Sequence, residues 1–145
     1  MLVNLRKIFI EWGDCDPGGI VYFPRYLEYC DACTNALFKR AGLPKPQMIK
    51  VYGIAGTPLV EPRARYFVPS QYGDRINVES RVSEWERSSF VVHHKLFKGD
   101  VLAVEVIEKR VWVARTEGDA VRFKRQAIPK EVREKFSVST HARED

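Results

Sequence analysis

A single helical segment followed by a series of strand-like segments is the feature that most restricts the fold of this chain. Turn-forming residues such as Gly73-Asp74 and Gly99-Asp100 separate the strand-like segments, and short turns of this kind connect antiparallel neighbours. The sequence therefore predicts an α+β fold with one antiparallel sheet. The expected strands downstream of the helix are residues 58–68, 75–86, 89–98, 101–115 and 120–125.

The helical segment is predicted over residues 24–41. Pro24 suits the first turn of a helix, where its missing N–H has no partner to lose, and Gly42-Leu43-Pro44 supplies a stop signal. We expect a strongly twisted sheet to wrap the helix, bury its apolar stripe and leave a sheet face or edge for self-association. That stripe consists of Tyr26, Cys30, Cys33 and Leu37.

The remaining segments complete one domain. A strand over residues 2–12 precedes the helix, and a short helix over 129–136 follows the last strand. A chain of 145 residues with 45% hydrophobic composition is long enough for one sizeable core and too short for two ordinary domains. We therefore expect a single domain over residues 1–137 and a polar C-terminal tail over 138–145.

Composition argues against several classes of protein. Three cysteines are an odd number, which fits a reducing compartment, and no second Cys or His pair completes a zinc site. The formal net charge of +5 favours an anionic ligand, but no nucleic-acid motif accompanies the basic residues. No run of about 18 apolar residues is present to span a bilayer. We expect a cytoplasmic protein that uses no metal and binds neither nucleic acid nor membrane.

The chemistry is expected in the acidic loop of residues 12–26, which joins the first strand to the helix. Asp14 and Asp16 lie there beside Pro17 and two glycines. A carboxylate near the positive end of a helix and a set of backbone N–H donors can face the same carbonyl, which suits acyl transfer. Judged on spacing alone, both aspartates can also be turn and cap residues.

Several stretches of the chain match the pattern of one family. The longest is Gly13-Asp14-Cys15-Asp16-Pro17-Gly18-Gly19-Ile20-Val21-Tyr22-Phe23-Pro24-Arg25-Tyr26. Weaker matches are Gly56-Thr57-Pro58, Glu84-Trp85 with Ser89-Phe90-Val91, and Ile128-Pro129. Together they span nearly the whole chain, which resembles the 4-hydroxybenzoyl-CoA thioesterase family of the hotdog-fold superfamily.

This resemblance implies a hotdog fold, with a long central helix wrapped by a twisted antiparallel sheet. It also implies a homodimer, often a dimer of dimers, with the active site at the protomer interface. Asp16 is the implied catalytic carboxylate, and the backbone N–H of Phe23 the implied donor to the thioester carbonyl. Asp31 matches a position near the acyl end of the site, and Thr57 is a candidate hydrogen-bonding residue there. No cofactor is implied beyond the CoA of the substrate.

The sequence departs from the family pattern where the CoA phosphates are expected. A strongly basic stretch follows the family's tryptophan, whereas here Glu86-Arg87-Ser88 retains one cation, Arg87. We expect Lys124 and Arg125, or Arg122, to supply the missing contacts, since these residues lie near the last strand. The same residues can equally be solvated surface.

The predicted function is hydrolysis of an aromatic acyl-CoA such as 4-hydroxybenzoyl-CoA. Asp16 can act as nucleophile or as general base, and the sequence does not choose between them. Two alternatives stay open: a thioesterase for short or medium aliphatic acyl-CoA, and a non-catalytic module that binds CoA esters or nucleic acid. A hotdog dehydratase fits less well, because no histidine occurs in residues 1–92. Glu28, another carboxylate on the helix, is expected on a solvated face.

Overall fold

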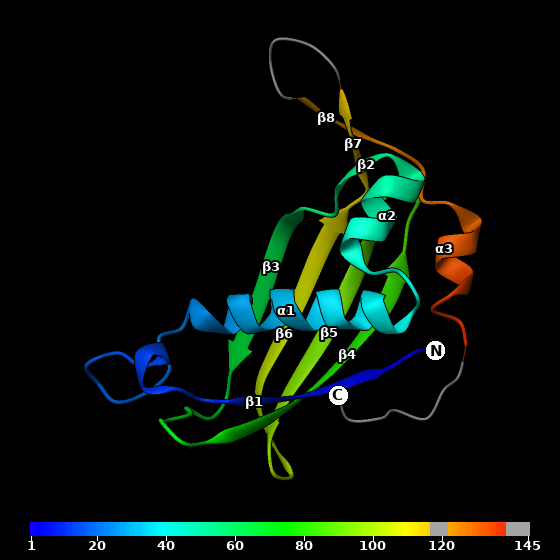
Figure 1. Cartoon of the computed structure of the whole chain (residues 1–145). Coiled ribbons are helices and arrows are strands. Elements are labelled where there is room, and N and C mark those ends of the chain that lie inside the picture. The colour runs from blue at the N-terminus through cyan, green and yellow to red at the C-terminus, as the bar shows by residue number, and fades with distance from the viewer. Residues whose placement is uncertain (117–121, 139–145) are drawn as a thin grey trace.

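The computed structural model describes residues 1–116 and 122–138, and its main element is a five-stranded antiparallel sheet (Figure 1). The strand order is β1-β4-β5-β6-β3, so β1 and β3 form the two edges. The predicted α+β class is confirmed, and the arrangement is the hotdog fold. The strands are β1 (Asn4–Phe9), β3 (Leu59–Tyr66), β4 (Arg75–Trp85), β5 (Ser89–Lys98) and β6 (Val101–Val111).

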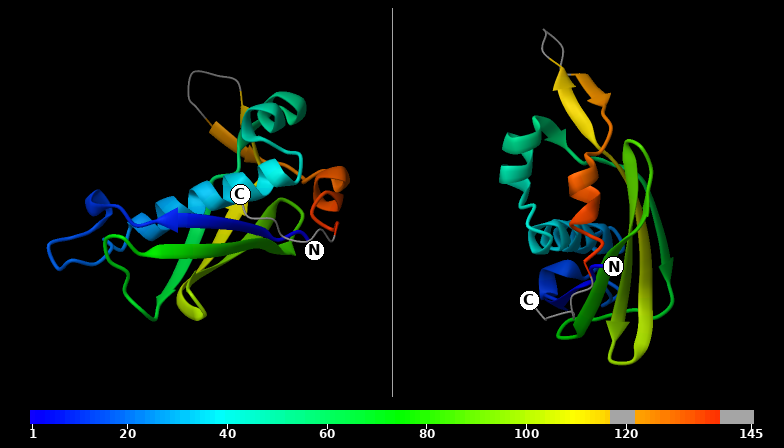
Figure 2. Two further views of the ribbon diagram at one scale, coloured as in Figure 1. Left: turned by 60° about the horizontal axis from the view of Figure 1, so that its bottom comes forward. Right: turned by 90° about the vertical axis from the view of Figure 1, so that its right-hand side faces the viewer.

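The helix α1 (Arg25–Arg40) crosses one face of this curved sheet (Figures 1 and 2). Its predicted stripe is buried: Cys30, Cys33 and Leu37 are fully inaccessible to solvent. Cys30 and Cys33 pack with core residues of the sheet such as Val78, because the pleat turns every second side chain of a strand toward the helix. This helix and sheet together form the core on which the candidate site is built.

A second, three-stranded sheet projects from one end of the first (Figure 2). It contains β2 (Ile54–Gly56), β7 (Val113–Thr116) and β8 (Arg122–Arg125) in the order β2-β7-β8. The expectation of one strand over 101–115 is wrong, because the chain changes sheets at Trp112. That residue is buried, and its backbone N–H bonds to Ser88 O at 2.8 Å while its carbonyl accepts from Gln126 N–H at 3.0 Å.

The segment after α1, which the sequence indicated as a connection, contains the helix α2 (Lys45–Tyr52). Pro44 occupies its N-cap and Pro46 lies in its first turn, where a missing N–H has no consequence. Gly53 ends it in the left-handed conformation with φ of 64°, which glycine adopts without steric cost. The prolines and the glycine therefore delimit a helix, and β2 follows directly.

The secondary-structure elements at both ends of the chain are shorter than the sequence indicated. The first strand covers Asn4–Phe9 instead of residues 2–12, and Trp12–Asp14 form a 3-10 turn, η1. The terminal helix α3 spans Lys130–Glu134. The predicted tail falls largely on 139–145, outside the described residues, as do 117–121 of the last hairpin. Within the described part of the chain no helix is long and apolar enough to cross a membrane.

Candidate active site

Asp16 lies in a tight turn just ahead of α1. Its Oδ1 accepts a hydrogen bond from the backbone N–H of Gly18 at 2.8 Å, and its backbone carbonyl accepts from Gly19 N–H at 2.9 Å. Its own backbone N–H donates to Ile20 O at 2.9 Å. The side chain is half-buried. The turn therefore holds the carboxylate in place through one oxygen and leaves the group accessible.

Asp14 supports this turn, as the sequence interpretation expected of it. Its Oδ2 accepts from the backbone N–H of Glu11 at 3.1 Å, and its backbone carbonyl accepts from Tyr22 N–H at 2.8 Å. Arg25 at the start of α1 lies 3.9 Å from its Oδ1. These contacts tie the loop to the first turn of α1, which Phe23 and Pro24 directly precede.

The backbone N–H of Phe23 is a free donor at the N-terminus of α1. Among the described residues none accepts a hydrogen bond from it, whereas Tyr22 N–H and Arg25 N–H both have carbonyl acceptors. The aligned peptide dipoles of a helix place partial positive charge at this end. A carbonyl oxygen that gains negative charge is stabilised by such a donor.

A small apolar cavity of about 200 Å³ opens beside Phe23. Aromatic side chains form much of its wall: Phe23 from the loop, Tyr26 from α1, and Tyr66 and Phe67 at the end of β3. Ile20, whose carbonyl accepts the Asp16 N–H, also lines it. The candidate carboxylate therefore belongs to a loop that borders an aromatic-walled cavity.

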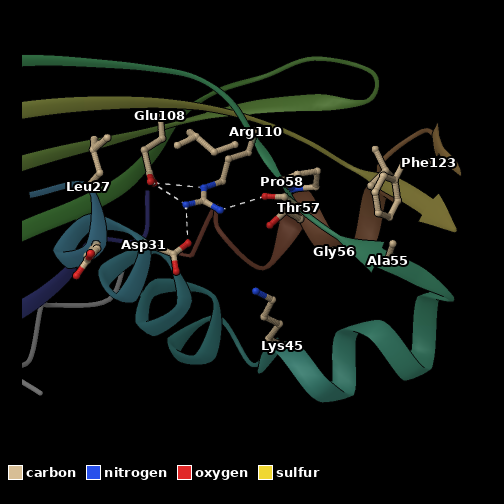
Figure 3. A pocket seen from close by; sticks show the side chains of 13 residues that line it. Leu27, Asp31, Lys45, Ala55, Gly56, Thr57, Pro58, Glu108, Arg110 and Phe123 are labelled. Carbon is tan, nitrogen blue, oxygen red and sulfur yellow. Dashed lines mark hydrogen bonds and ion pairs between the residues drawn. The ribbon is translucent and has the colours of Figure 1, made fainter. Parts of the chain in front are cut away.

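Asp31 and Thr57 line a different and larger pocket of about 580 Å³ (Figure 3). Its walls come from α1, from the segment around β2 and from the start of β3, and Phe123 of β8 closes one side. Glu28 lines the same pocket, although its side chain is 64% exposed and pairs with Arg25 at 2.9 Å. The predicted acyl-end residues are thus brought together, away from Asp16.

Arg110 of β6 links these two residues directly. Its Nη2 lies 2.9 Å from Asp31 Oδ1, and its Nη1 donates to Thr57 O at 3.0 Å. The same guanidinium donates to Glu108 Oε2 at 2.7 Å. Burial by itself would lower the pKa of Arg110, but the contacts with Glu108 and Asp31 outweigh it and raise the pKa. Arg110 therefore stays charged at the base of the pocket.

Glu108 is fully buried beneath Arg110. Burial alone would raise the pKa of this carboxyl group, but hydrogen bonds from His94 and Arg110 stabilise the carboxylate and lower the pKa to about 2. His93, the residue before His94 on β5, points to the other face of the sheet, where its Nε2 lies 3.3 Å from Glu105 Oε2. The adjacent histidines therefore face opposite sides of the sheet, because successive side chains of a strand alternate between its two faces.

The residues predicted to contact the CoA phosphates lie on two neighbouring segments of the chain. Arg87 is exposed, and its carbonyl accepts from Ile128 N–H at 2.8 Å. Lys124 and Arg125 are exposed on β8. The backbone of Trp112 joins the two segments, because it bonds to Ser88 on one side and to Gln126 on the other. Three exposed cations thus lie on adjacent segments outside the pocket at Asp31.

Comparison with known proteins places the chain among hydrolases of this fold. The model of the thioesterase-like superfamily matches residues 10–136. The chain belongs to this superfamily. It is 40% identical over 119 residues to the 4-hydroxybenzoyl-CoA thioesterase of Pseudomonas sp. (strain CBS-3), covering 78% of this chain and 84% of that protein. The resemblance that the sequence motifs indicated is therefore confirmed.

Solved structures of related thioesterases have the same architecture. An aspartate-to-asparagine mutant of 4-hydroxybenzoyl-CoA thioesterase complexed with 4-hydroxybenzoyl-CoA superposes with a TM-score of 0.82 and 32% identity, covering 93% of this chain and 99% of that one. A gentisyl-coenzyme A thioesterase superposes with a TM-score of 0.78 and 26% identity, covering 92% and 100%. The match extends over nearly the whole of this chain and of each related thioesterase.

Sequence reasoning about this thioesterase missed Glu108 and Arg110. Both were included in an expected strand without a site role, yet they line the pocket with Asp31. A signal was present, because residues 106, 108 and 110 of a strand share one face and Val106 belongs to the core. Here an apolar core residue is followed, at every second position, by two side chains of opposite charge. Such a pattern indicates a buried ion pair on the core-facing side of the strand.

Proposed function

We propose that this protein hydrolyses the thioester of an aromatic acyl-CoA, releasing the carboxylic acid and CoA. The observation that carries the proposal is that one loop holds Asp16 in a fixed turn and ends in the free N–H of Phe23 just ahead of α1. One group supplies the base or nucleophile, and the other polarises the carbonyl. Relatives named for hydroxylated aroyl-CoA substrates support the aromatic class.

The reaction needs little more than these two groups. Water adds through its oxygen to the thioester carbon while Asp16 takes its proton, or Asp16 attacks first and water cleaves the resulting anhydride. In both routes the carbon–sulfur bond breaks and the thiolate leaves. Its conjugate thiol has a pKa of about 8.5 if it resembles cysteine, so departure near neutral pH needs no strong acid. We expect no cofactor or metal.

Two protomers are proposed to complete each site. Phe23 lies at the Tyr66 end of β3, and Asp16 is bonded to Ile20 of the same cavity wall. Asp31 and Thr57 lie near the Leu59 end of β3. The exposed edge strand carries apolar side chains, with Val60, Tyr66 and Phe67 about half accessible. Pairing of β3 with a second copy about a twofold axis is antiparallel and sets unlike ends side by side. Asp16 of one protomer then faces the Asp31 pocket of its partner.

The other predicted features fit this arrangement. Asp31 and Thr57 contact the distal end of the acyl group, and Arg87, Lys124 and Arg125 hold the CoA phosphates. We expect residues 1–137 to form the single domain of a homodimer, with a dimer of dimers as the larger assembly. A cytoplasmic location fits the three cysteines, all of which are free thiols.

The test is release of free thiol from a panel of benzoyl-, 4-hydroxybenzoyl- and hexanoyl-CoA, with wild type beside Asp16→Asn. We expect aroyl esters to be hydrolysed faster than the alkyl ester, and the variant to lose roughly 10²- to 10⁴-fold in kcat, the usual contribution of a positioned base. Asp100→Asn, in the exposed hairpin between β5 and β6, is the matched control and should retain the activity. Preference for hexanoyl-CoA would assign an aliphatic thioesterase, and CoA binding without hydrolysis would assign a binding protein.

A further inference from the structure

A continuous line of polar side chains crosses the otherwise apolar space between α1 and the main sheet. It begins at Ser80 on β4, whose Oγ lies 2.7 Å from His94 Nδ1 on β5. His94 Nε2 lies 2.8 Å from Glu108 Oε1, and Glu108 bonds to Arg110, which reaches Asp31. The four members on the sheet are buried, whereas the Asp31 side chain is 54% exposed. The line therefore starts in the core and ends on the pocket wall.

Glu108 is fixed on every side that faces the core. Its Oε1 accepts hydrogen bonds from His94 and from the Thr34 hydroxyl of α1, and its Oε2 accepts from Arg110. Because a carboxylate only accepts hydrogen bonds, the proton of the His94 contact resides on Nε2, and the Ser80 hydroxyl pairs with the other ring nitrogen, Nδ1. Each group thus orients the next, which leaves the guanidinium of Arg110 with one arrangement.

Stability is a weak reason for such a cluster. Desolvating two charges is costly, and apolar residues of similar volume commonly stabilise a core as well or better. The geometry of the guanidinium offers another reason. Its planar donors reach Glu108, the Thr57 carbonyl and Asp31 at the same time. Asp31, half-exposed on a helix, is thereby held through Oδ1, while its other oxygen points away from Arg110 (Figure 3).

We propose that Arg110 is a positioning residue for substrate selection: backed by Glu108 and His94, it fixes the Asp31 carboxylate so that the pocket favours acyl groups carrying a hydroxyl. This inference rests on the proposed function. The charges of Arg110 and Glu108 cancel, and Glu28 is paired with Arg25, which leaves Asp31 and Lys45 as the unbalanced charges on the pocket wall. Of these two, the Asp31 carboxylate is the hydrogen-bond acceptor. A carboxylate accepts a hydrogen bond from a phenolic O–H and repels a second carboxylate.

The experiment measures binding separately from hydrolysis. The probes are two thioether analogues of CoA, carrying 4-hydroxyphenyl or phenyl ketones, in which a methylene group between sulfur and carbonyl prevents cleavage. Dissociation constants are measured by calorimetry for wild type, Arg110→Lys, Asp31→Asn and the double variant. Arg81→Lys on β4, with its arginine outside this line of contacts, is the matched control. Thiol release from the corresponding esters is measured in parallel.

We expect wild type and Arg81→Lys to bind the hydroxylated probe more tightly, and Arg110→Lys to reduce that preference by roughly tenfold, the usual effect of losing a hydrogen bond to a charged group. Asp31→Asn should reduce it similarly, and the double variant no further, because both changes affect one interaction. Binding of the phenyl probe should change little. Lysine retains the charge but cannot span the three partners of Arg110.

An unchanged preference in Arg110→Lys would overturn the positioning role, whatever the rate of hydrolysis. Absence of hydrolysis in wild type, with the preference present and lost in the variant, would refute the proposed function and support the positioning role. If Arg110→Lys does not fold, Glu108→Gln replaces it, since the amide turns an N–H toward the guanidinium and displaces it. That variant should show the same loss of preference, and a retained preference there would equally overturn the inference.

Discussion

The backbone N–H of Gly18 donates to Asp16 Oδ1 at 2.8 Å, and a Cβ built on Gly18 would lie 3.0 Å from that same oxygen. The turn and the carboxylate therefore occupy adjoining space. Any side chain at position 18 must displace the carboxylate from the position in which the turn holds it.

Gly18→Ala is expected to lower kcat by roughly tenfold, because small displacements of a reacting group are costly to the rate. Gly18 lacks a positive φ, so the backbone itself tolerates alanine. Gly13→Ala is the matched control, since a Cβ there meets nothing within 4 Å. Steady-state thiol release on one aroyl-CoA measures both. Equal rates for the two variants would show that the position of Oδ1 is not critical.

Mixing two variants that are impaired at different residues should restore activity on 4-hydroxybenzoyl-CoA if the sites are shared between protomers. Asp16→Asn and Asp31→Asn place their defects at opposite ends of β3. A mixed dimer then contains one site with both defects and one site with neither. Random exchange makes half of the dimers mixed, so about one quarter of wild-type activity should return. Activity no higher than the average of the two variants would contradict the shared site.

A charge on the exposed edge of β3 should separate the dimer. Val60→Asp places a carboxylate at a position that is 48% exposed in the single chain and is proposed to be covered by the partner. The molar mass measured by light scattering should fall to about half of the wild-type value, because each chain of 16.8 kDa loses the partner paired with it at β3. Val101→Asp, equally exposed at the start of β6, is the control. A dimer that survives Val60→Asp would exclude this edge as the interface.

Removing the exposed cations should weaken binding of CoA esters without slowing the chemistry. Arg87→Ala combined with Arg125→Ala is expected to raise KM several-fold, with kcat nearly unchanged, because these residues contact groups remote from the thioester. The same KM should rise with added salt in wild type. Lys50→Ala on α2 controls for the loss of surface charge. An unchanged KM would assign the phosphates to other cations.

Acid should destabilise the fold through Glu108. Its pKa is lowered to about 2 in the folded protein, below the value of about 4.3 for a free glutamate. The carboxylate thus contributes stability above pH 4.3 that is lost as the pH falls toward 2. The linked free energy is on the order of 3 kcal/mol. Urea unfolding at pH 7, 4, 3 and 2 should show a shallower loss for Glu108→Gln than for wild type. Glu61→Gln, exposed on β3, should behave as wild type.

Much of the main sheet could be predicted because its turns are local. The hairpin at Gly99-Asp100 separates strands that end at Lys98 and begin at Val101, as the turn residues indicated. The helix α2 was missed because the prolines and the glycine that delimit it also indicate loops. The change of sheet at Trp112 was missed because its cause is tertiary: the hydrogen bonds of that residue go to residues 88 and 126.

The candidate site divides in the same way. Asp16 and Phe23 lie on one continuous stretch that matches the family motif, so the resemblance implied the carboxylate and the N–H donor together. Glu108 and Arg110 acquire their place beside Asp31 through strand pairing and helix packing across many residues. Their partners could not be assigned from spacing alone, although the sequence does contain two opposite charges at strand positions that face the core.

The passage of the chain from one sheet to the other at Trp112 couples two parts of the proposed site. Residues up to Val111 belong to the register that places Glu108 and Arg110, whereas β7 and β8 pair in a register of their own. Phe123 of β8 nevertheless lines the pocket with Asp31, and Lys124 and Arg125 follow it directly along the strand. A change in this hairpin that alters the exposed cations is therefore expected to alter the pocket wall as well.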